Sequence, residues 1–380
     1  MKIGVLIGQV VQIGGVCIAA FEEVRNLRAV GHDAELVILQ ERPEFRFDDF
    51  AGDIPIRYIS RELPAWARID FKIPFFSFFR FFHLRSFFTA KKVIRDQEYD
   101  LLIVHETYNC FAALSLKKDR HIPFKVFLWD PASYILPRVY QNSFLGLFLP
   151  ILFPLSLLLD KKIIKEAEEV IVCSDLHKKY IEGIGGRDKT KIVYPGCYPL
   201  EKLPEEKKQY LLALTKWDIG KNPFLLLDVL KILVDKNIKL IVAGNWVQED
   251  YRLEFIDKIK QEGLVDRVGL IDRVDDLQKI QLFSGAIVLV HPIIEAFGMM
   301  CLEAAGCGCP SIIPKGSGVT NIFEHGTQGF FPTEGDINAY AGYINDLVAD
   351  TALAAKMGNA AWEVAKQNTW VEHAKKILMQ

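Results

Sequence analysis

The chain has 380 residues, enough for about two domains that each bury a hydrophobic core. Its 46 basic and 48 acidic residues nearly balance, so no net basic field favours nucleic acid, which is not an expected partner. Seven cysteines, odd in number and scattered through apolar segments, favour reduced thiols and a cytoplasmic location over a disulfide framework.

The first forty residues predict the opening of an α/β domain. Residues 2–8 are an apolar run typical of a buried strand, 9–15 form a glycine-bearing loop, and 16–30 have helical periodicity. A second strand is expected at 33–39. A strand, a glycine loop, a helix and a strand in this order favour a doubly wound parallel sheet over a signal peptide.

Apolar runs at 100–105, 124–129 and 169–173 predict further strands of the same sheet. In a sheet of this kind the ligand lies at the carboxyl ends of the strands. Polar side chains at these ends, such as those of His105 and Asp130, are therefore candidates for a functional site.

Two segments of this first domain are unusually rich in large apolar side chains. Residues 71–88 hold nine phenylalanines interleaved with basic residues, and residues 144–159 form an apolar stretch interrupted by two prolines. Either fits a helix buried in the core, and the second is shorter than the ~20 residues that span a bilayer. Their occurrence in one domain favours a surface that meets the inner face of the cell membrane.

The second half of the chain predicts another α/β domain. Residues 196–209 are polar and charged, which is typical of a linker between domains. Five further strands are then expected, at 210–214, 240–244, 268–271, 286–290 and 311–314.

The most informative segment reads Glu-Ala-Phe-Gly-Met-Met-Cys-Leu-Glu, from Glu295 to Glu303. It places two carboxylates eight positions apart across a loop-to-helix junction. Helix formers follow Gly298 and two later glycines are typical of a helix end, so the helix is expected to begin near Phe297. Free N–H groups at a helix start attract anions, and a glycine lets a ligand approach the backbone, which suits a sugar phosphate.

This motif resembles the donor-site motif of the retaining glycosyltransferases of family four, which have the GT-B fold. The resemblance covers essentially the whole chain and is strongest over 169–375. It implies an α/β fold of two Rossmann-like, doubly wound parallel-sheet domains that face each other across a cleft. The domains would be 1–195 and 210–367, joined by the linker 196–209, with a C-terminal helix in 368–380 that crosses back to the first domain.

The resemblance also implies roles for single residues of the motif. Glu295 would hydrogen-bond the donor sugar, and Glu303 would hold the ribose hydroxyls. The backbone groups that face the sugar and the diphosphate would be those of Phe297, Gly298 and Met299.

Two more segments resemble parts of the family's donor site. Lys216 and Lys221 stand where the family usually has arginine and then lysine, and they would neutralise the diphosphate. Lys216 would act as a point charge, whereas the guanidinium of an arginine can form two parallel hydrogen bonds. Gly14 and Gly15 resemble the N-terminal glycine pair whose amides approach the diphosphate, an ordinary tight turn being the alternative.

One departure from the family concerns the first domain. The family often carries a histidine close to the donor sugar where this chain has Trp129 and Asp130. Asp130 could hydrogen-bond the sugar or the acceptor, and Trp129 could stack on a sugar face. His105, which ends the preceding strand, is the nearest other histidine, and a histidine packed under a loop is the alternative for it.

The implied activity is transfer of a sugar from a UDP- or GDP-sugar to an acceptor, with retention of the anomeric configuration. No cofactor and no metal are expected, because nothing resembles a DxD sequence in the required place. The expected partners are the nucleotide sugar and a glycan or lipid-linked acceptor in cell-surface glycan or glycolipid synthesis. The alternatives are a non-catalytic nucleotide-sugar-binding scaffold of the same fold and a sugar-nucleotide epimerase.

Overall fold

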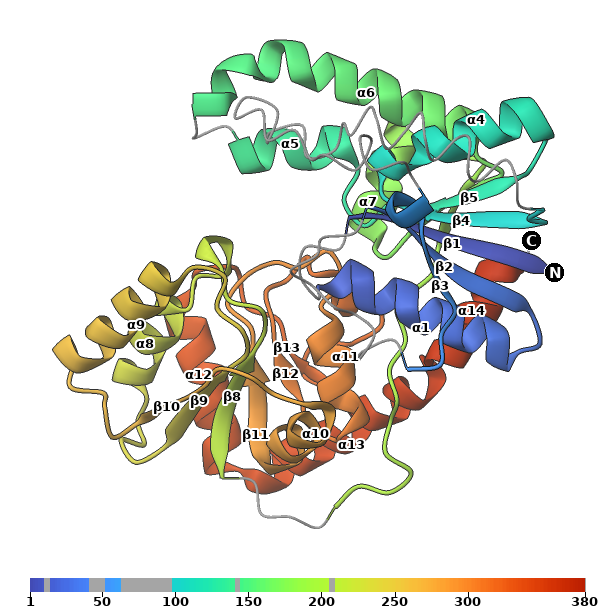
Figure 1. Cartoon of the computed structure of the whole chain (residues 1–380). Coiled ribbons are helices and arrows are strands. Elements are labelled where there is room, and N and C mark those ends of the chain that lie inside the picture. The colour runs from blue at the N-terminus through green and yellow to red at the C-terminus, as the bar shows by residue number, and fades with distance from the viewer. Residues whose placement is uncertain (10–13, 41–51, 63–97, 141–143, 205–208, 380) are drawn as a thin grey trace. The chain divides into compact units, whose positions relative to one another are not determined.

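The structure is a computed structural model of the whole chain and describes residues 1–9, 14–40, 52–62, 98–140, 144–204 and 209–379 (Figure 1). The apolar segment 71–88 therefore lies outside the described residues. The chain divides into two compact units: unit 1 is Met1–Tyr194 with Trp370–Gln380, and unit 2 is Pro195–Thr369. The chain thus passes between the units twice, and the last eleven residues belong to unit 1.

Unit 1 is built on a parallel sheet, whose described strands have the order β3-β2-β1-β4-β5-β6-β7. The strands are β1 Lys2–Gln9, β2 Asp33–Gln40, β3 Ile56–Tyr58, β4 Leu101–His105, β5 Phe124–Phe127, β6 Glu169–Val172 and β7 Thr190–Ile192. Every residue of β4 and β5 is buried. This is why these strands read as continuous apolar runs, since a central parallel strand is covered on both faces.

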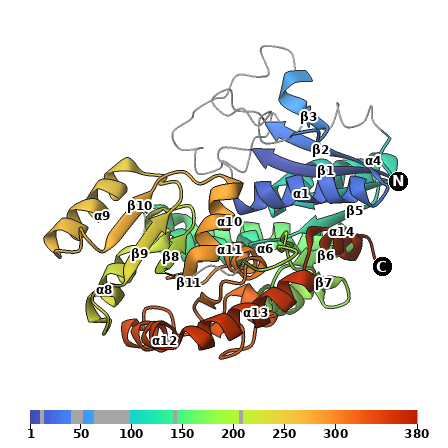
Figure 2. The same cartoon turned by 90° about the horizontal axis from the view of Figure 1, so that it is seen from below.

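Helices cover both faces of this sheet, as Figures 1 and 2 show. The helices of unit 1 are α1 Gly15–Ala29, α4 Cys110–Arg120, α5 Ala132–Tyr140, α6 Leu149–Glu166, α7 Asp175–Ile181 and α14 Trp370–Leu378. Helices α1 and α14 pack side by side on one face. On the other face Leu116 of α4 and Ile163 of α6 join a core with Val104 and Val126.

Unit 2 has a second parallel sheet with the strand order β10-β9-β8-β11-β12-β13. Its strands are β8 Tyr210–Leu214, β9 Lys239–Ala243, β10 Val268–Ile271, β11 Ala286–Val290, β12 Ser311–Ile312 and β13 Gly329–Phe330. Its helices are α8 Phe224–Ile232, α9 Glu249–Gln261, α10 Asp276–Gly285, α11 Met299–Gly306, α12 Ile337–Ala349 and α13 Thr351–Gln367. The core of this unit includes the buried side chains of Phe255, Leu226 and Tyr340.

The predicted fold class, two parallel-sheet α/β domains, is confirmed. The strands β3, β7 and β13 were not predicted, because each has only two or three residues and is too short to show periodicity. Strand β12 ends at Ile312 rather than Pro314, since proline has no N–H to donate to the ladder.

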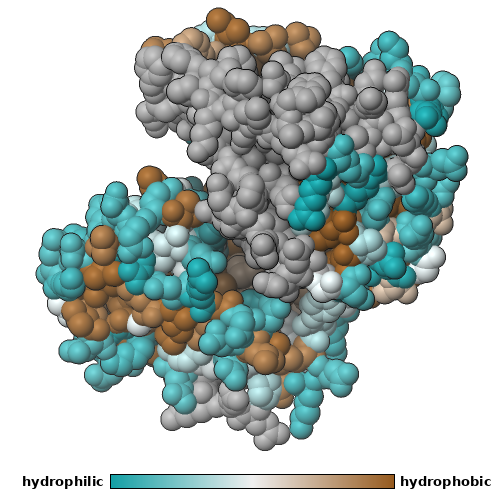
Figure 3. Space-filling view, in the orientation of Figure 1, coloured by the Kyte–Doolittle hydropathy of each residue, from teal (hydrophilic) through white to brown (hydrophobic). Residues whose placement is uncertain are grey.

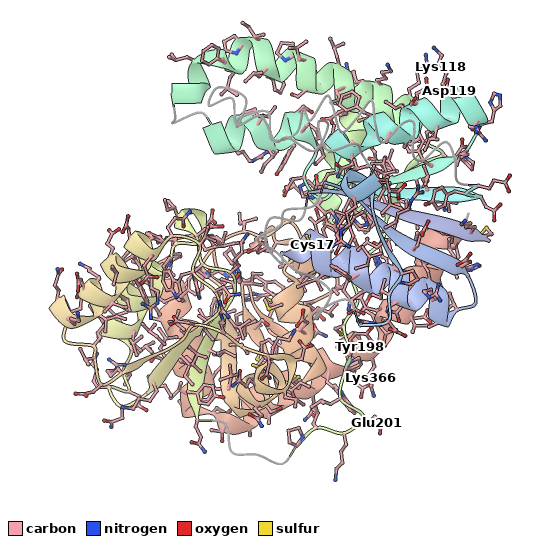
Figure 4. The ribbon with its side chains drawn as sticks, viewed as in Figure 1. Cys17, Lys118, Asp119, Tyr198, Glu201 and Lys366 are labelled. Carbon is pink, nitrogen blue, oxygen red and sulfur yellow. The ribbon has the colours of Figure 1, made fainter. Side chains whose placement is uncertain are left out.

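The segment that follows the first passage from unit 1 to unit 2, at Pro195, lies against α13. Trp362 Nε1 donates a hydrogen bond to the carbonyl of Leu200 at 2.9 Å. Figure 4 shows Tyr198 and Glu201 on this segment, with Lys366 on α13. The first part of the expected linker is therefore packed on unit 2.

The apolar stretch 144–159 forms a 3₁₀ turn, Phe144–Phe148, and the first half of α6. Its large apolar side chains reach the surface, with 73% of Leu147 and 64% each of Ile151 and Leu158 exposed. They contribute to the brown area at the top of Figure 3. The interpretation of this stretch as a buried core helix is therefore wrong.

None of the helices in the described part of the chain is both long enough and apolar enough to cross a membrane.

Candidate functional site

The loop between β11 and α11 turns sharply at Gly298, the N-cap residue of α11. Its φ of 98° and ψ of 55° lie in the left-handed region. A Cβ atom here would lie 3.0 Å from Ile313 Cδ1 and 3.4 Å from Val319 Cγ1. Both the backbone conformation and the packing therefore require glycine.

Glu295 lies three residues before this turn, and its backbone is fixed by the loop that contains Ser317. The Glu295 N–H donates to Ser317 Oγ at 3.1 Å, and its carbonyl accepts from the N–H of Gly318 at 3.2 Å. Its carboxylate forms an ion pair with Lys221 and lies 3.1 Å from His291 Nε2. With 22% of its side chain exposed, Glu295 remains accessible to a ligand.

The neighbours of Glu295 keep its carboxyl group ionised. Burial by itself raises the pKa of Glu295, but a hydrogen bond and positive charge from His291, together with those of Lys221, lower it to about 2. Glu295 therefore presents hydrogen-bond acceptors and a negative charge at every pH at which the protein would be assayed.

His291 is part of this cluster and was not predicted. It follows β11, is 3% exposed, and its Nδ1 lies 3.2 Å from the carbonyl of Ile293. Because a carbonyl only accepts, Nδ1 carries a proton, and the ring orientation is fixed with Nε2 toward Glu295. The only signal in the sequence is a histidine at a strand end four residues before the motif, which is common in buried positions as well.

The loop that contains Lys216 and Lys221 is held at the end of β9 by a hydrogen bond. Trp217 is fully buried and donates from Nε1 to the carbonyl of Ala243 at 2.9 Å. The structure brings Lys221 to Glu295, as the motif predicts for a common site. Lys216 is half-buried and, within the described residues, has no ion pair or side-chain hydrogen bond.

Glu303 lies on α11, where its carboxylate forms an ion pair of 2.6 Å with Lys279 of α10. Burial by itself would lower the pKa of Lys279, but the charge and hydrogen bond of Glu303 raise it overall. Lys279 is therefore charged, and 16% of the Glu303 side chain is exposed. The pair holds the carboxylate in one orientation, which suits recognition of neighbouring hydroxyl groups.

The backbone around Gly298 is only partly available to a ligand. Phe297 is buried, and its carbonyl accepts from the N–H of Val319 at 2.6 Å. The N–H groups of Met299 and Met300 begin α11 and have no acceptor within the helix. The two amides therefore give this edge of unit 2 a positive partial charge.

In unit 1, polar side chains gather where β5 and β6 end. Asp130 follows β5 with 38% of its side chain exposed, and its Oδ1 lies 3.3 Å from Nε2 of His177. Ser174, the N-cap of α7, lies 2.9 Å from Nδ1 of the same ring. His177 is 2% exposed, and within the described residues its Nε2 makes no hydrogen bond besides this contact with Asp130. A ligand hydroxyl could accept from His177 and donate to Asp130.

Aromatic rings lie beside this pair. The ring of Tyr134 meets His177 edge-on at 5.0 Å and Tyr180 at 5.1 Å between centroids. The guanidinium of Arg138 lies 3.5 Å from the centre of the Tyr134 ring. A carboxylate, an imidazole and half-buried aromatic rings are the groups that commonly bind neutral sugars, because they match hydroxyls and apolar C–H faces.

Trp129 and His105 lie beneath the surface instead. Trp129 is 6% exposed and stacks on Phe127 with 4.4 Å between centroids, so its face is not open to a sugar. His105 is fully buried, and its ring contacts Trp129 at 3.1 Å through Nδ1 and Glu23 at 2.9 Å through Nε2. The structure therefore does not bring His105 together with Asp130 at one exposed site.

Glu106 is a second acidic group at this edge that was not predicted. Its φ of 70° and ψ of 147° are rarely adopted by residues other than glycine. Burial, together with the negative charges of Asp130 and Asp160, raises its pKa well above the usual range. This shift favours the protonated form of Glu106, whose O–H can donate a hydrogen bond.

The glycine pair precedes α1. Gly14 is its N-cap, with an extended backbone, and no heavy atom would lie within 4 Å of a Cβ added there. Gly15 is exposed. Residues 10–13 of the same loop lie outside the described chain.

Among the described residues, no group of three or more histidine, cysteine or acidic side chains is arranged to hold a metal ion.

The chain forms two Rossmann-like units, and each has polar side chains at the carboxyl ends of its strands. This is the architecture of GT-B proteins. Solved structures agree: Anabaena HepE in complex with UDP and glucose has a TM-score of 0.76 at 20% identity, covering 99% of this chain and 98% of that one. Sucrose-phosphate synthase from Thermosynechococcus elongatus has a TM-score of 0.78 at 18% identity, covering 99% and 97%. These likenesses establish the fold.

Two family models together cover nearly the whole chain. Residues 13–199 match "Glycosyltransferase Family 4", and residues 200–364 match "Glycosyl transferases group 1". The chain belongs to the family-four glycosyltransferases.

Curated relatives match parts of the chain. The N-acetyl-alpha-D-glucosaminyl L-malate synthase of Bacillus anthracis is 28% identical over 35% of this chain and 34% of its own length. The alpha-1,3/1,6-mannosyltransferase of Homo sapiens is 29% identical over 42% and 41%, and the D-inositol 3-phosphate glycosyltransferase of Streptomyces avermitilis is 30% identical over 40% and 34%. The chain thus spans about a third to a half of the length of the curated relatives it matches.

Proposed function

We propose that the protein is a retaining glycosyltransferase that uses a UDP- or GDP-sugar as donor. The observation that carries this proposal is the cluster of Glu295, Lys221 and His291 at the start of α11, in a chain of this family. The cluster combines an ionised acceptor for sugar hydroxyls with cations for a diphosphate. Glu303, held by Lys279, is assigned to the ribose hydroxyls.

In the proposed reaction the bond between the anomeric carbon and the diphosphate oxygen breaks, and the acceptor oxygen bonds to the same face of the sugar. The acceptor proton passes to the leaving diphosphate, which therefore serves as the base. Negative charge grows on the diphosphate in the transition state, where Lys216, Lys221 and the amides at Met299 and Met300 would stabilise it. Glu295 orients the donor sugar and is not a nucleophile in this scheme.

The acceptor is assigned to the carboxyl edge of the sheet in unit 1. Nε2 of His177, which makes no hydrogen bond among the described residues and lies beside Asp130 and Tyr134, supports recognition of a neutral hydroxyl of a sugar. Burial and the neighbouring negative charges favour a protonated carboxyl at Glu106, which would add a donor at the same edge.

The exposed apolar side chains of the 3₁₀ turn and α6 support an acceptor that is lipid-linked. The exposed apolar residues are Leu147, Phe148, Ile151, Phe153, Leu155 and Leu158. Lys161 and Lys162 follow them on the same helix and are exposed, which suits an anionic membrane surface. We therefore propose peripheral contact with the membrane on which such an acceptor would reside.

Calorimetric titration of the protein with UDP, GDP and ADP, in the presence of a chelator, tests the donor site without knowledge of the acceptor. Preference for one nucleotide, followed by slow hydrolysis of the matching nucleotide sugar, is the expected result. Binding without any turnover, in the presence of a panel of acceptors, would favour the scaffold alternative. Interconversion of the free nucleotide sugar would favour the epimerase, and binding of none of the three would contradict the assignment of the donor residues.

A further inference from the structure

A buried chain of hydrogen bonds in unit 1 begins at the C-terminal helix and ends at Trp129, just after β5. Its centre is Glu23 of α1, which is fully buried. Glu23 Oε1 lies 3.0 Å from Nε2 of His373 in α14, and Oε2 lies 2.9 Å from Nε2 of His105 in β4. The outer nitrogens of the rings contact the Tyr194 carbonyl, at 2.7 Å from His373, and the Trp129 indole, at 3.1 Å from His105.

These contacts fix the proton on each ring nitrogen. The Trp129 Nε1–H can only donate, so Nδ1 of His105 accepts and its Nε2 carries the single ring proton. The Tyr194 carbonyl can only accept, so Nδ1 of His373 carries a proton. An ionised Glu23 also only accepts, and Nε2 of His373 must then carry a second proton.

The ionisation of Glu23 agrees with its surroundings. Burial by itself raises the pKa of Glu23, but positive charge beside it and hydrogen bonds from both imidazoles lower it overall. Nδ1 of His105 accepts from the indole N–H, so this ring carries one proton and no charge. With Glu23 ionised, the hydrogen-bond geometry therefore places the positive charge on His373.

We propose that His373 is a buried imidazolium whose counter-ion is Glu23, and that this ion pair positions α14 on unit 1 while neutral His105 holds Trp129. Helix α14 has only nine residues and follows unit 2 in the chain. A helix of this length is marginal alone, so its place depends on tertiary contacts. The pair is fully buried, and removing one partner would leave the other charge without compensation.

The same chain of contacts connects the two points at which the polypeptide passes between the units to the carboxyl edge of the unit 1 sheet, where the acceptor is assigned. Tyr194 is the last residue of unit 1 before the first crossing, and His373 lies four residues after the second. Trp129 directly precedes Asp130. Glu23 and the two histidines are therefore positioning residues, which hold the ends of unit 1 and the Trp129 segment in one arrangement without touching a substrate.

Nitrogen-15 NMR of the histidine side chains in the full-length protein at pH 7.5 tests the proton assignment, with resonances identified from His373→Gln and His105→Gln. Two protonated ring nitrogens are expected for His373 and one, Nε2, for His105. A single protonated nitrogen on His373 would overturn the proposal.

Glu23→Gln gives a sharper second measurement because it keeps the shape and every hydrogen bond. The amide oxygen can accept from His105, and the amide nitrogen can donate to Nε2 of His373. We expect the variant to fold, with His373 losing its Nε2 proton; a ring that remains doubly protonated would show that Glu23 is not the counter-ion. Glu372→Gln, on the exposed side of α14, is the matched control and should leave the His373 spectrum unchanged.

Hydrogen exchange measured by mass spectrometry tests the positioning role. Glu23→Ala should increase amide exchange in 370–378 at least tenfold and leave exchange in β11 of unit 2 unchanged. Wild-type protection of 370–378 in this variant would contradict the role. If Glu23→Ala does not fold, the same comparison is made with His373→Gln, for which the same two outcomes apply.

Discussion

At the scale of single residues, the candidate donor site depends on how Glu295 is held. Lys221 and His291 reach its carboxylate from different segments of unit 2, and Ser317 fixes its backbone. The arrangement leaves Glu295 ionised and oriented before a ligand arrives. Such preorganisation is effective in catalysis because it requires no rearrangement when charge develops.

Glu295→Gln should therefore lower kcat by a factor of about 10²–10³, the usual cost of removing one oriented polar group from an active site. Nucleotide affinity should change less than about threefold, because the carboxylate is assigned to the sugar. Steady-state kinetics and calorimetry measure the two quantities. Glu324→Gln, an exposed residue of unit 2, is the control, and a nucleotide affinity that falls as much as kcat would contradict the assignment.

The pH dependence of Glu295 follows from its lowered pKa. The folded value of about 2 lies below the ordinary 4.5, so its stabilising contacts are fully present above 4.5 and are lost only as the pH falls toward 2. A decline of kcat/KM between pH 5 and 7 would come from another group and should persist in Glu295→Gln. Loss of that decline in the variant would show that Glu295 titrates there.

Gly298→Ala tests the turn that starts α11. The left-handed backbone and the 3.0 Å contact with Ile313 should lower the free energy of unfolding by about 1–3 kcal/mol. Gly269→Ala, in β10, has an ordinary backbone conformation and no neighbour within 4 Å, so a change below about 0.5 kcal/mol is expected. Urea unfolding of both variants measures the difference, and equal effects would contradict this role for Gly298.

At the scale of elements, α6 combines two different halves. Its C-terminal half buries Asp160, Ile163 and Ile164 in unit 1, whereas its N-terminal half exposes large apolar side chains. A contiguous exposed apolar surface on a folded protein usually marks a place of contact. The basic residues that follow it make an anionic membrane the expected partner.

Replacing Ile151, Leu155 and Leu158 together by serine should reduce flotation with anionic vesicles at least tenfold, because the apolar area available for insertion is lost. The control variant replaces Leu253 and Leu277, two exposed leucines of unit 2, by serine and should float like the wild type. Unchanged flotation of the triple variant would show that this half of α6 does not contact the membrane.

At the scale of the whole molecule, all seven cysteines lie in the described chain, none of them in a disulfide, and every one except Cys17 is buried. Cys17 lies at the start of α1, as Figure 4 shows. Burial raises the pKa of Cys110, Cys173 and Cys197 and, for Cys301, gives a value of about 12, so few thiolates are present at pH 8.

A disulfide reagent should therefore label one thiol rapidly in the native protein and seven in denaturant. Cys17→Ser should remove the rapid phase and leave six thiols in denaturant. Several rapid thiols in the native wild type would show that the burial described here is not maintained in solution. The reaction can be followed by absorbance and the labelled residue identified by mass spectrometry.

The sequence by itself determined the two-domain α/β class, the main strands of both sheets and the start of the motif helix, because apolar period, glycine and chain order are local signals. It also indicated that Glu295 and Lys221 belong to one site. The tertiary structure alone added His291, Glu106 and His177, since a buried polar residue is recognised only by the partners around it. It also moved His105 from a candidate for catalysis to a buried position between Glu23 and Trp129. These partners come from segments far apart in the chain, and folding alone brings them within hydrogen-bonding distance.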